Sequence, residues 1–374
     1  MAASLVGRVR RSLAFRTRAA IGRTTGRLRR LCRIARAPGD RTRSPAGPAA
    51  TVLEPQFSPR AMARSGQTSY FAGGTRRYAT CTGVAWTRPD RLVSAFLLGT
   101  SIVTYSFEAH GDQPRIRHLA TAVEPERLGW IESLAVSPDG RWLATVDSNT
   151  GRCLVLAVDP DSGVPDPVPV ASTGVPGDHF MHGVTWTPGG QAVLFTTIDG
   201  AGNIRVADFG VTAGTARLAP PIPIDNPRPG CMPKGVAFSP DGRFLAIGYG
   251  PNVTGSAVLD RPATSVDVHR YDPTTVIGER VSRTPDDWLP AGSVECVAWT
   301  PDGRRLVATD QVGDQALIAD VDPDSGAITG LAARIGWSAG KLSFPHGCAP
   351  SPDGRWLAVT NYGDGSLRLY RTGP

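Results

Sequence analysis

Apolar and polar positions follow the same short pattern six times between Gly83 and the C-terminus. Each copy has an apolar strand, a turn built on Pro-Asp-Gly or a variant of it, and a second, almost continuously apolar strand. The copies begin at Gly83, Ser133, Gly183, Gly235, Cys296 and Gly347, so they are 50, 50, 52, 61 and 51 residues apart. A repeat of this length with several strands per unit is typical of propellers and related arrays.

The strands within one copy can be assigned from their periodicity. Val236 and Phe238 alternate with Ala237, which indicates a half-buried strand, and the Pro-Asp-Gly turn favours a tight hairpin. A third strand follows, as at 265–271, and a DPDSG turn at 159–163 and 322–326 leads to a weaker fourth strand. The sequence therefore predicts an all-β, six-bladed propeller of four-stranded antiparallel blades, with seven blades as the alternative.

The sixth unit ends directly after its third strand. Residues 67–80 precede the first unit and have the composition of a strand. We expect them to supply the missing outer strand and to close the ring, because closure removes an exposed sheet edge.

The phrase SPDGRWLAVTNYGDGSLRLY, residues 351–370, resembles the bacterial YVTN/lactonase-like and WD40-like propellers, and its variants cover all six units. Those families include lactonases, lyases and scaffolds. The resemblance implies the fold, and the chemistry has to be inferred from the site.

Charge divides the chain into two parts. Residues 1–45 hold 13 arginines and one acidic residue, whereas the remainder has 27 basic and 32 acidic residues. We interpret residues 1–65 as an Arg-rich leader and linker, and residues 66–374 as the propeller. The leader is either an amphipathic basic helix that contacts an anionic membrane or nucleic acid, or a disordered tail or misassigned start.

Other patterns narrow the class of protein. No apolar run reaches the roughly 18 residues of a membrane span. The six cysteines form no CxxC pair, which favours a reducing, cytoplasmic location. No Walker loop, dinucleotide fingerprint or HExxH motif is present, so we expect no nucleotide cofactor.

One position of the repeat carries most of the candidate chemistry. The residue before each first strand lies at the rim of the central channel in a propeller. In chain order these residues are Thr82, Glu132, His182, Lys234, Glu295 and His346. In a six-fold ring, Glu132 would face Glu295, His182 would face His346, and Lys234 would face Thr82.

These residue types suit two kinds of site. His182, His346, Glu132 and Glu295 could bind one divalent metal ion. Without metal, Glu132, Glu295 and Lys234 could form a catalytic acid/base set, or Lys234 could act as a Schiff-base amine. The alternative is a hydrated channel whose polar residues tie the blades together.

Second-strand ends and the nearby loops supply further candidates on the same face. We expect Asp147, Asp310, Asn361 and Tyr362 to lie around the site, and His179 to reach it from a loop. The alternative for the Asp and Asn residues is a turn.

The sequence thus predicts a small-molecule enzyme with its site at the channel mouth. The expected chemistry is acid/base or metal-assisted hydrolysis, lyase or cyclisation chemistry. The alternative is a non-catalytic scaffold, which should show exposed aromatic patches, but most tryptophans lie within strands.

Overall fold

The computed structural model describes residues 70–72, 75–77, 81–96, 101–110, 113–123, 130–148, 150–174, 180–197, 203–251, 264–289, 292–336, 342–363 and 365–372. These residues belong to one compact unit within Gly47–Pro374. The predicted leader and linker, residues 1–65, lies outside the described residues, as does His179. The described part contains one short 3-10 turn, η1 (Asp286–Trp288), and no helix there is long and apolar enough to cross a membrane.

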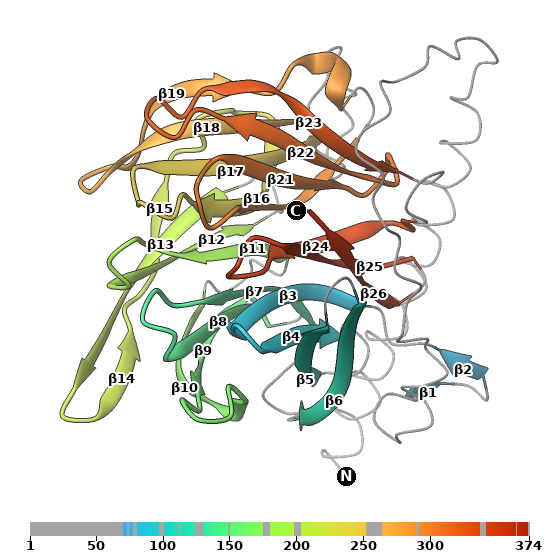
Figure 1. Ribbon diagram of the computed structural model, residues 1–374. Coiled ribbons are helices and arrows are strands. Elements are labelled where there is room, and N and C mark those ends of the chain that lie inside the picture. Colours follow the sequence, from blue (N-terminus) through green and yellow to red (C-terminus); the bar gives the residue numbers. More distant parts are fainter. Residues whose placement is uncertain are drawn as a thin grey trace. The chain divides into compact units, whose positions relative to one another are not determined.

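From Cys81 onward, the described strands form six antiparallel sheets that correspond to the six repeats (Figure 1). Blades 1 and 2 consist of β3 (Cys81–Arg88), β4 (Arg91–Phe96), β5 (Ser101–His110) and β6 (Gln113–Val123), then β7 (Ile131–Val136), β8 (Trp142–Asp147), β9 (Arg152–Val158) and β10 (Pro165–Gly174). Blades 3 and 4 consist of β11 (Met181–Trp186), β12 (Ala192–Thr197), β13 (Asn203–Thr212), β14 (Thr215–Leu218) and β15 (Ile222–Ile224), then β16 (Cys231–Phe238), β17 (Phe244–Pro251), β18 (Ser265–Asp272) and β19 (Val276–Arg283). Blades 5 and 6 consist of β20 (Val294–Trp299), β21 (Arg305–Asp310), β22 (Gln315–Val321) and β23 (Ile328–Gly336), then β24 (Pro345–Pro350), β25 (Trp356–Asn361) and β26 (Ser366–Arg371).

The turn between the first two strands of a blade has the predicted structure. In blade 2, Oδ1 of Asp139 accepts hydrogen bonds from the Ser137 hydroxyl and the Arg141 amide. Gly140 has a φ of 72°, a conformation that favours glycine. The same arrangement recurs at Asp241 and Asp353. The Pro-Asp-Gly signal therefore fixes the hairpins that set each inner strand.

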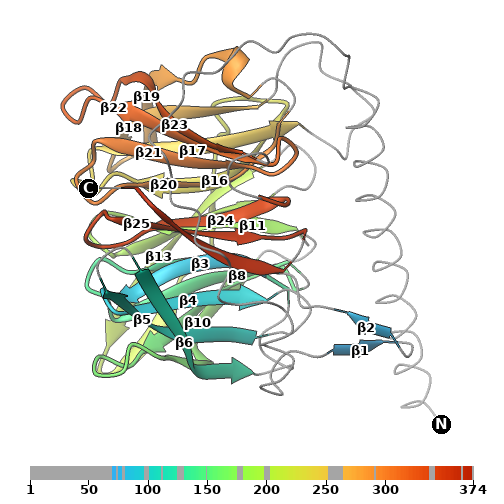
Figure 2. The ribbon, with the colours of Figure 1, turned by 45° about the vertical axis from the view of Figure 1, so that its right-hand side comes forward.

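The hydrophobic core is divided among the interfaces between neighbouring blades and does not form one central cluster. Buried apolar residues form six clusters, and each cluster joins two neighbouring blades. One of them joins Val84 and Phe96 of blade 1 to Trp356 and Leu369 of blade 6. Figures 1 and 2 show blade 6, in dark red, beside blade 1, in blue. The ring is therefore closed with six blades, as predicted, and the seven-bladed alternative is wrong.

The way in which the ring closes differs from the prediction. Blade 6 has three described strands, β24, β25 and β26. In the segment 67–80, the described strands β1 (Tyr70–Ala72) and β2 (Thr75–Arg77) pair with each other in a separate sheet. A segment folded back on itself does not act as one outer strand. Two hydrogen bonds also join blades 6 and 1, and each involves the inner strand β3: Nε1 of Trp86 donates to the Ala349 carbonyl, and the Thr360 hydroxyl donates to the Thr82 carbonyl.

Candidate functional site

Every inner strand is irregular at the position that carries the candidate chemistry. The pairing of the first and second strands shifts register there in all six blades. A bulge adds a residue to one strand and changes the direction of its side chain. The residues at these six bulges are Thr82, Glu132, His182, Lys234, Glu295 and His346.

The structure brings five of these side chains into one continuous cluster. Oε2 of Glu132 lies 3.0 Å from Nε2 of His346, and the imidazole rings of His346 and His182 stack with centroids 5.2 Å apart. Nε2 of His182 lies 2.7 Å from Oε2 of Glu295. Oε1 of Glu295 in turn lies 2.5 Å from Nζ of Lys234. Residues from five blades therefore meet, as the repeat register predicts.

The pairing within the cluster differs in part from the expected opposition across the ring. His182 does face His346, as expected. Each carboxylate, however, pairs with an imidazole two blades away, and Lys234 pairs with Glu295 of the neighbouring blade. Opposite charges attract, so two carboxylates placed near two imidazoles and an ammonium take those partners rather than each other. The six-fold symmetry of the ring alone does not predict which residues form these ion pairs.

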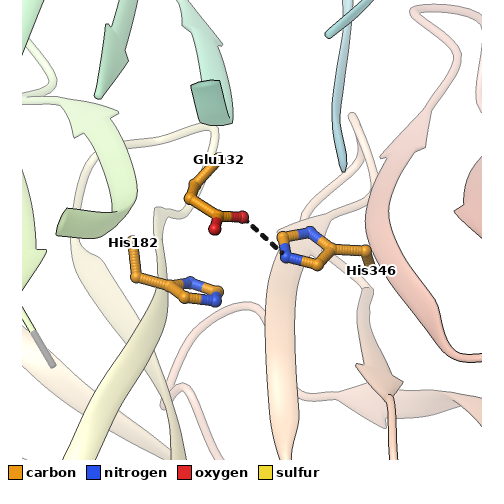
Figure 3. Close-up of side chains that lie close together, drawn as sticks. All are labelled: Glu132, His182 and His346. Atoms are coloured by element: carbon orange, nitrogen blue, oxygen red, sulfur yellow. Dashed lines mark ion pairs between the residues drawn. The ribbon is translucent and has the colours of Figure 1, made fainter. Parts of the chain in front are cut away.

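Three of the residues have the geometry of a metal-ligand set. Glu132, His182 and His346 each offer one ligand atom, and these atoms lie within 4.8 Å of one another. Figure 3 shows the Glu132 carboxylate and both imidazoles directed toward a common space. Two histidines and one carboxylate are a known set of protein ligands for a catalytic zinc ion, which keeps a further position open.

Two buried atoms of this set have no hydrogen-bond partner. They are Nδ1 of His182 and Oε2 of Glu132, whose contact with His346 is close but not aligned as a hydrogen bond. Nε2 of His182 is engaged by Glu295, which leaves Nδ1 as the atom with a free lone pair. A carboxylate that holds one imidazole nitrogen while the other binds metal is a common arrangement in metalloproteins.

Glu295, predicted as a ligand or a base, is not part of the three-residue ligand group. Its Oε1 accepts hydrogen bonds from Lys234 and from the Ser293 hydroxyl. Burial would raise the pKa of Glu295, but the Lys234 ammonium and the His182 imidazole outweigh it and hold that pKa well below its usual range. Glu295 therefore carries a negative charge at neutral pH and is a weak base.

His346 responds in the opposite direction. Burial alone would lower its pKa, but contact with the Glu132 carboxylate, together with the charge of Glu295, raises it above the ordinary value. Tyr362 stacks on the same ring, with centroids 6.1 Å apart. Burial, with the nearby carboxylates, raises the pKa of Tyr362, so its phenol keeps its proton.

The other candidates, which lie at the ends of second strands, accept hydrogen bonds from backbone amides of the neighbouring loops. Asp147 accepts a hydrogen bond from the Trp130 amide, Asp310 from the Ser293 amide, and Asn361 from the Ser343 amide. Each of these amides lies two or three residues before Glu132, Glu295 or His346. These side chains therefore hold the backbone of the loops that lead into the site residues, as the turn interpretation predicts, and a role for them in the chemistry stays a prediction.

Sequence reasoning missed a set of threonines on the second strands. The Thr309 hydroxyl accepts a hydrogen bond from the Cys296 amide, next to Glu295, and donates one to the His346 carbonyl, 2.5 Å away. Thr196 and Thr360 bridge neighbouring blades in the same way. We call Thr196, Thr309 and Thr360 the bridging threonines. Their shared place in the segments AVLFTT, RLVATD and WLAVTN is the signal that could have revealed them.

The inner strands approach so closely that a side chain is excluded next to the site. A Cβ at Gly183 would lie 2.0 Å from the Lys234 carbonyl oxygen, and one at Gly347 would lie 2.6 Å from that of Thr82. These glycines allow the six bulges to converge.

Comparison with known proteins gives the fold. A family model described as "WD domain, G-beta repeat" matches residues 343–371, in blade 6. No curated protein matches the chain in sequence.

Solved structures of similar fold cover most of the chain. Hydrazine synthase of Kuenenia stuttgartiensis has a TM-score of 0.51 and 15% identity, over 81% of this chain and 99% of that chain. A protein from Lactobacillus plantarum has a TM-score of 0.51 and 16% identity, over 80% of this chain and 83% of that chain. The WD40 repeats of RRP9 have a TM-score of 0.51 and 12% identity, over 79% of this chain and 96% of that chain. Likeness at these identities concerns the fold alone, and it agrees with the resemblance found in the repeats: the chain has the β-propeller fold.

Proposed function

We propose that the protein binds one divalent metal ion, with zinc the best match, through Glu132, His182 and His346. The observation that carries this proposal is the pairing of Glu295 with Nε2 of His182, which leaves the buried Nδ1 without a partner. Burying a polar atom without a hydrogen bond costs about 1–3 kcal/mol, and a bound cation would remove that cost at both His182 and Glu132.

We propose small-molecule chemistry at this site, of the hydrolase or lyase type. A bound divalent ion would polarise a substrate oxygen and lower the pKa of a water molecule. Glu295 fixes the orientation and tautomer of His182, and Lys234 keeps Glu295 charged. Tyr362 stacks on His346 and retains its proton, so it would be available to donate a hydrogen bond to an oxygen on which negative charge develops. A Schiff-base role for Lys234 is not proposed, because an ion-paired ammonium is not a free amine.

A structural role is the second candidate, because the same contacts tie distant blades together. The Glu132–His346 pair joins blades 2 and 6, and the His182–Glu295 pair joins blades 3 and 5. A scaffold that uses the cluster only as a cross-link would not bind metal stoichiometrically. A contact of residues 1–45 with anionic lipid or nucleic acid, and a cytoplasmic location, stay predictions from the sequence.

Zinc binding separates the two candidates. Chelator-treated protein is dialysed against zinc, and its metal content is measured by elemental analysis. We expect one zinc ion per chain in the native protein, and at least a tenfold loss of affinity in His182→Ala and in His346→Ala. His118→Ala is the matched control, because His118 bonds Thr121 on an outer strand.

The thermal midpoint of each variant is measured in parallel. If the alanine variants fail to fold, Glu132→Gln keeps the side-chain volume and removes one charged ligand. Absence of zinc from the native protein, or equal binding by native protein and folded variants, would show that the cluster is structural.

A further inference from the structure

The central channel contains a cavity that begins at the five-residue cluster. It lies on the side of the cluster opposite to the loops that precede the inner strands. Its volume is about 350 Å³, and its wall includes all six inner strands. Glu132, Glu295 and His346 line one part of it. The lining continues along the strands to Trp86, Trp299 and Pro352, and Pro352 belongs to the hairpin turn of blade 6. The cavity thus connects the cluster with the face that carries these turns.

Small side chains line the middle of this channel. At the third residue after the bulge position, the six blades carry Ala85, Ala135, Thr185, Ala237, Ala298 and Ala349, and all six line the cavity. We call this set the alanine ring. Ala135, Ala237 and Ala298 are partly exposed although their strands are innermost, so the channel is the space to which they are exposed. The preceding residues, such as Val236 and Val297, are buried between blades.

In three blades the next residue along the strand is a tryptophan that is fixed by a hydrogen bond to the neighbouring blade. Nε1 of Trp86, Trp186 and Trp299 donates to the carbonyl of Ala349, Ala135 and Ala237, respectively. Each indole is therefore fixed against the neighbouring inner strand. The alanine ring therefore lies along the route from the turn face to Glu132 and His346.

We propose that this channel is the ligand pocket and that ligands reach the metal-binding cluster from the turn face, past the alanine ring. The ligand is a compact carboxylate with an apolar body. This inference rests on the proposed function, because a carboxylate head would bind at the metal ion.

Charge and shape together specify this ligand class. A divalent cation held by one carboxylate and two neutral imidazoles keeps one net positive charge, since Glu295 and Lys234 neutralise each other. Most of the residues that line the cavity wall beyond the cluster are valine, alanine and tryptophan. The cavity is at the small end of the usual range for ligand pockets, which is roughly 300–1,000 Å³.

One channel cysteine reports on the route independently of any activity. Cys296 lines the cavity directly beyond Glu295 and is partly exposed. Its alkylation by N-ethylmaleimide in metal-free protein is followed by peptide mass mapping. In the double variant Ala135→Leu/Ala298→Leu, which places larger side chains on opposite blades, we expect this alkylation to slow at least tenfold. Ala120→Leu, on the outer strand β6, is the matched control.

If the leucine pair prevents folding, Ala135→Val/Ala298→Val makes a smaller constriction at the same positions. An unchanged alkylation rate in a folded constricted variant would overturn the route.

Protection by benzoate tests the ligand class. In zinc-loaded native protein, benzoate should slow the alkylation of Cys296, whereas benzylamine should not, and His346→Ala should abolish the protection. Absence of benzoate protection in protein that holds zinc would overturn the ligand class while leaving the metal site intact. Absence of zinc would overturn the proposed function and the ligand class, and the alkylation rates of the constricted variants would still decide the route.

Discussion

A single imidazole shows how its neighbours determine its chemistry. His182 is buried among charged groups, and its contact with Glu295 at Nε2 leaves Nδ1 without a hydrogen-bond partner. Glu295 can do this at neutral pH because Lys234 lies 2.5 Å from its other oxygen. The chain has only two lysines, and placing one of them here gives this carboxylate a cationic partner.

His346 gives the metal-free protein a specific dependence of stability on pH. Its pKa is raised in the folded state, so its contribution is fully present below the ordinary value of 6.5 and is lost as pH rises through the folded-state pKa. In chelator, the unfolding free energy of the native protein should exceed that of His346→Gln most at pH 5.5. The difference should shrink at higher pH, by up to about 1.4 kcal/mol per pH unit within that window. Urea unfolding at pH 5.5 and pH 8.5 measures it, and a difference that grows with pH would contradict the assigned contact with Glu132.

At the scale of the element, the bulges and the bridging threonines position the cluster. A bulge turns each site residue toward the axis, and the threonine of one blade holds the backbone of the next. This arrangement explains how side chains from separate strands keep a common geometry.

Substitution of a bridging threonine should therefore affect metal binding at a distance. Thr309→Val removes the hydrogen bonds to the Cys296 amide and to the His346 carbonyl, and we expect zinc affinity to fall about tenfold. Thr87→Val is the matched control, because Thr87 also bonds across blades but to Gly163, far from the site. Calorimetric titration of both variants with zinc makes the comparison. Equal losses in the two would mean that only general stability had changed.

At the scale of the whole molecule, the sequence predicts the ring well. Period, turn chemistry and strand alternation are local signals, and each is repeated six times, so fold and blade number follow from them. The register also identifies the five convergent residues, because equivalent repeat positions occupy equivalent places around a closed ring.

Features that depend on contacts between repeats could not be predicted in this way. His182 and Lys234 both pair with Glu295. This pairing depends on the charges of residues in other blades and on their distances across the ring, and the sequence of a single repeat contains neither. The pairing of β1 with β2, rather than with β26, has no signal in the composition of the segment. The bridging threonines were visible as a shared position, but their function appears only when neighbouring blades are placed together.

The proposed function depends on a cation at the centre of the ring, and anomalous diffraction at the zinc edge tests for that cation most directly. Crystals of the full chain grown with zinc should give one strong anomalous peak, about 2.0–2.2 Å from a carboxylate oxygen of Glu132 and from one nitrogen each of His182 and His346. Glu295 should lie outside bonding distance of the peak and remain on Nε2 of His182. No peak at this position, or one bound by Glu295 in place of His182, would contradict the account.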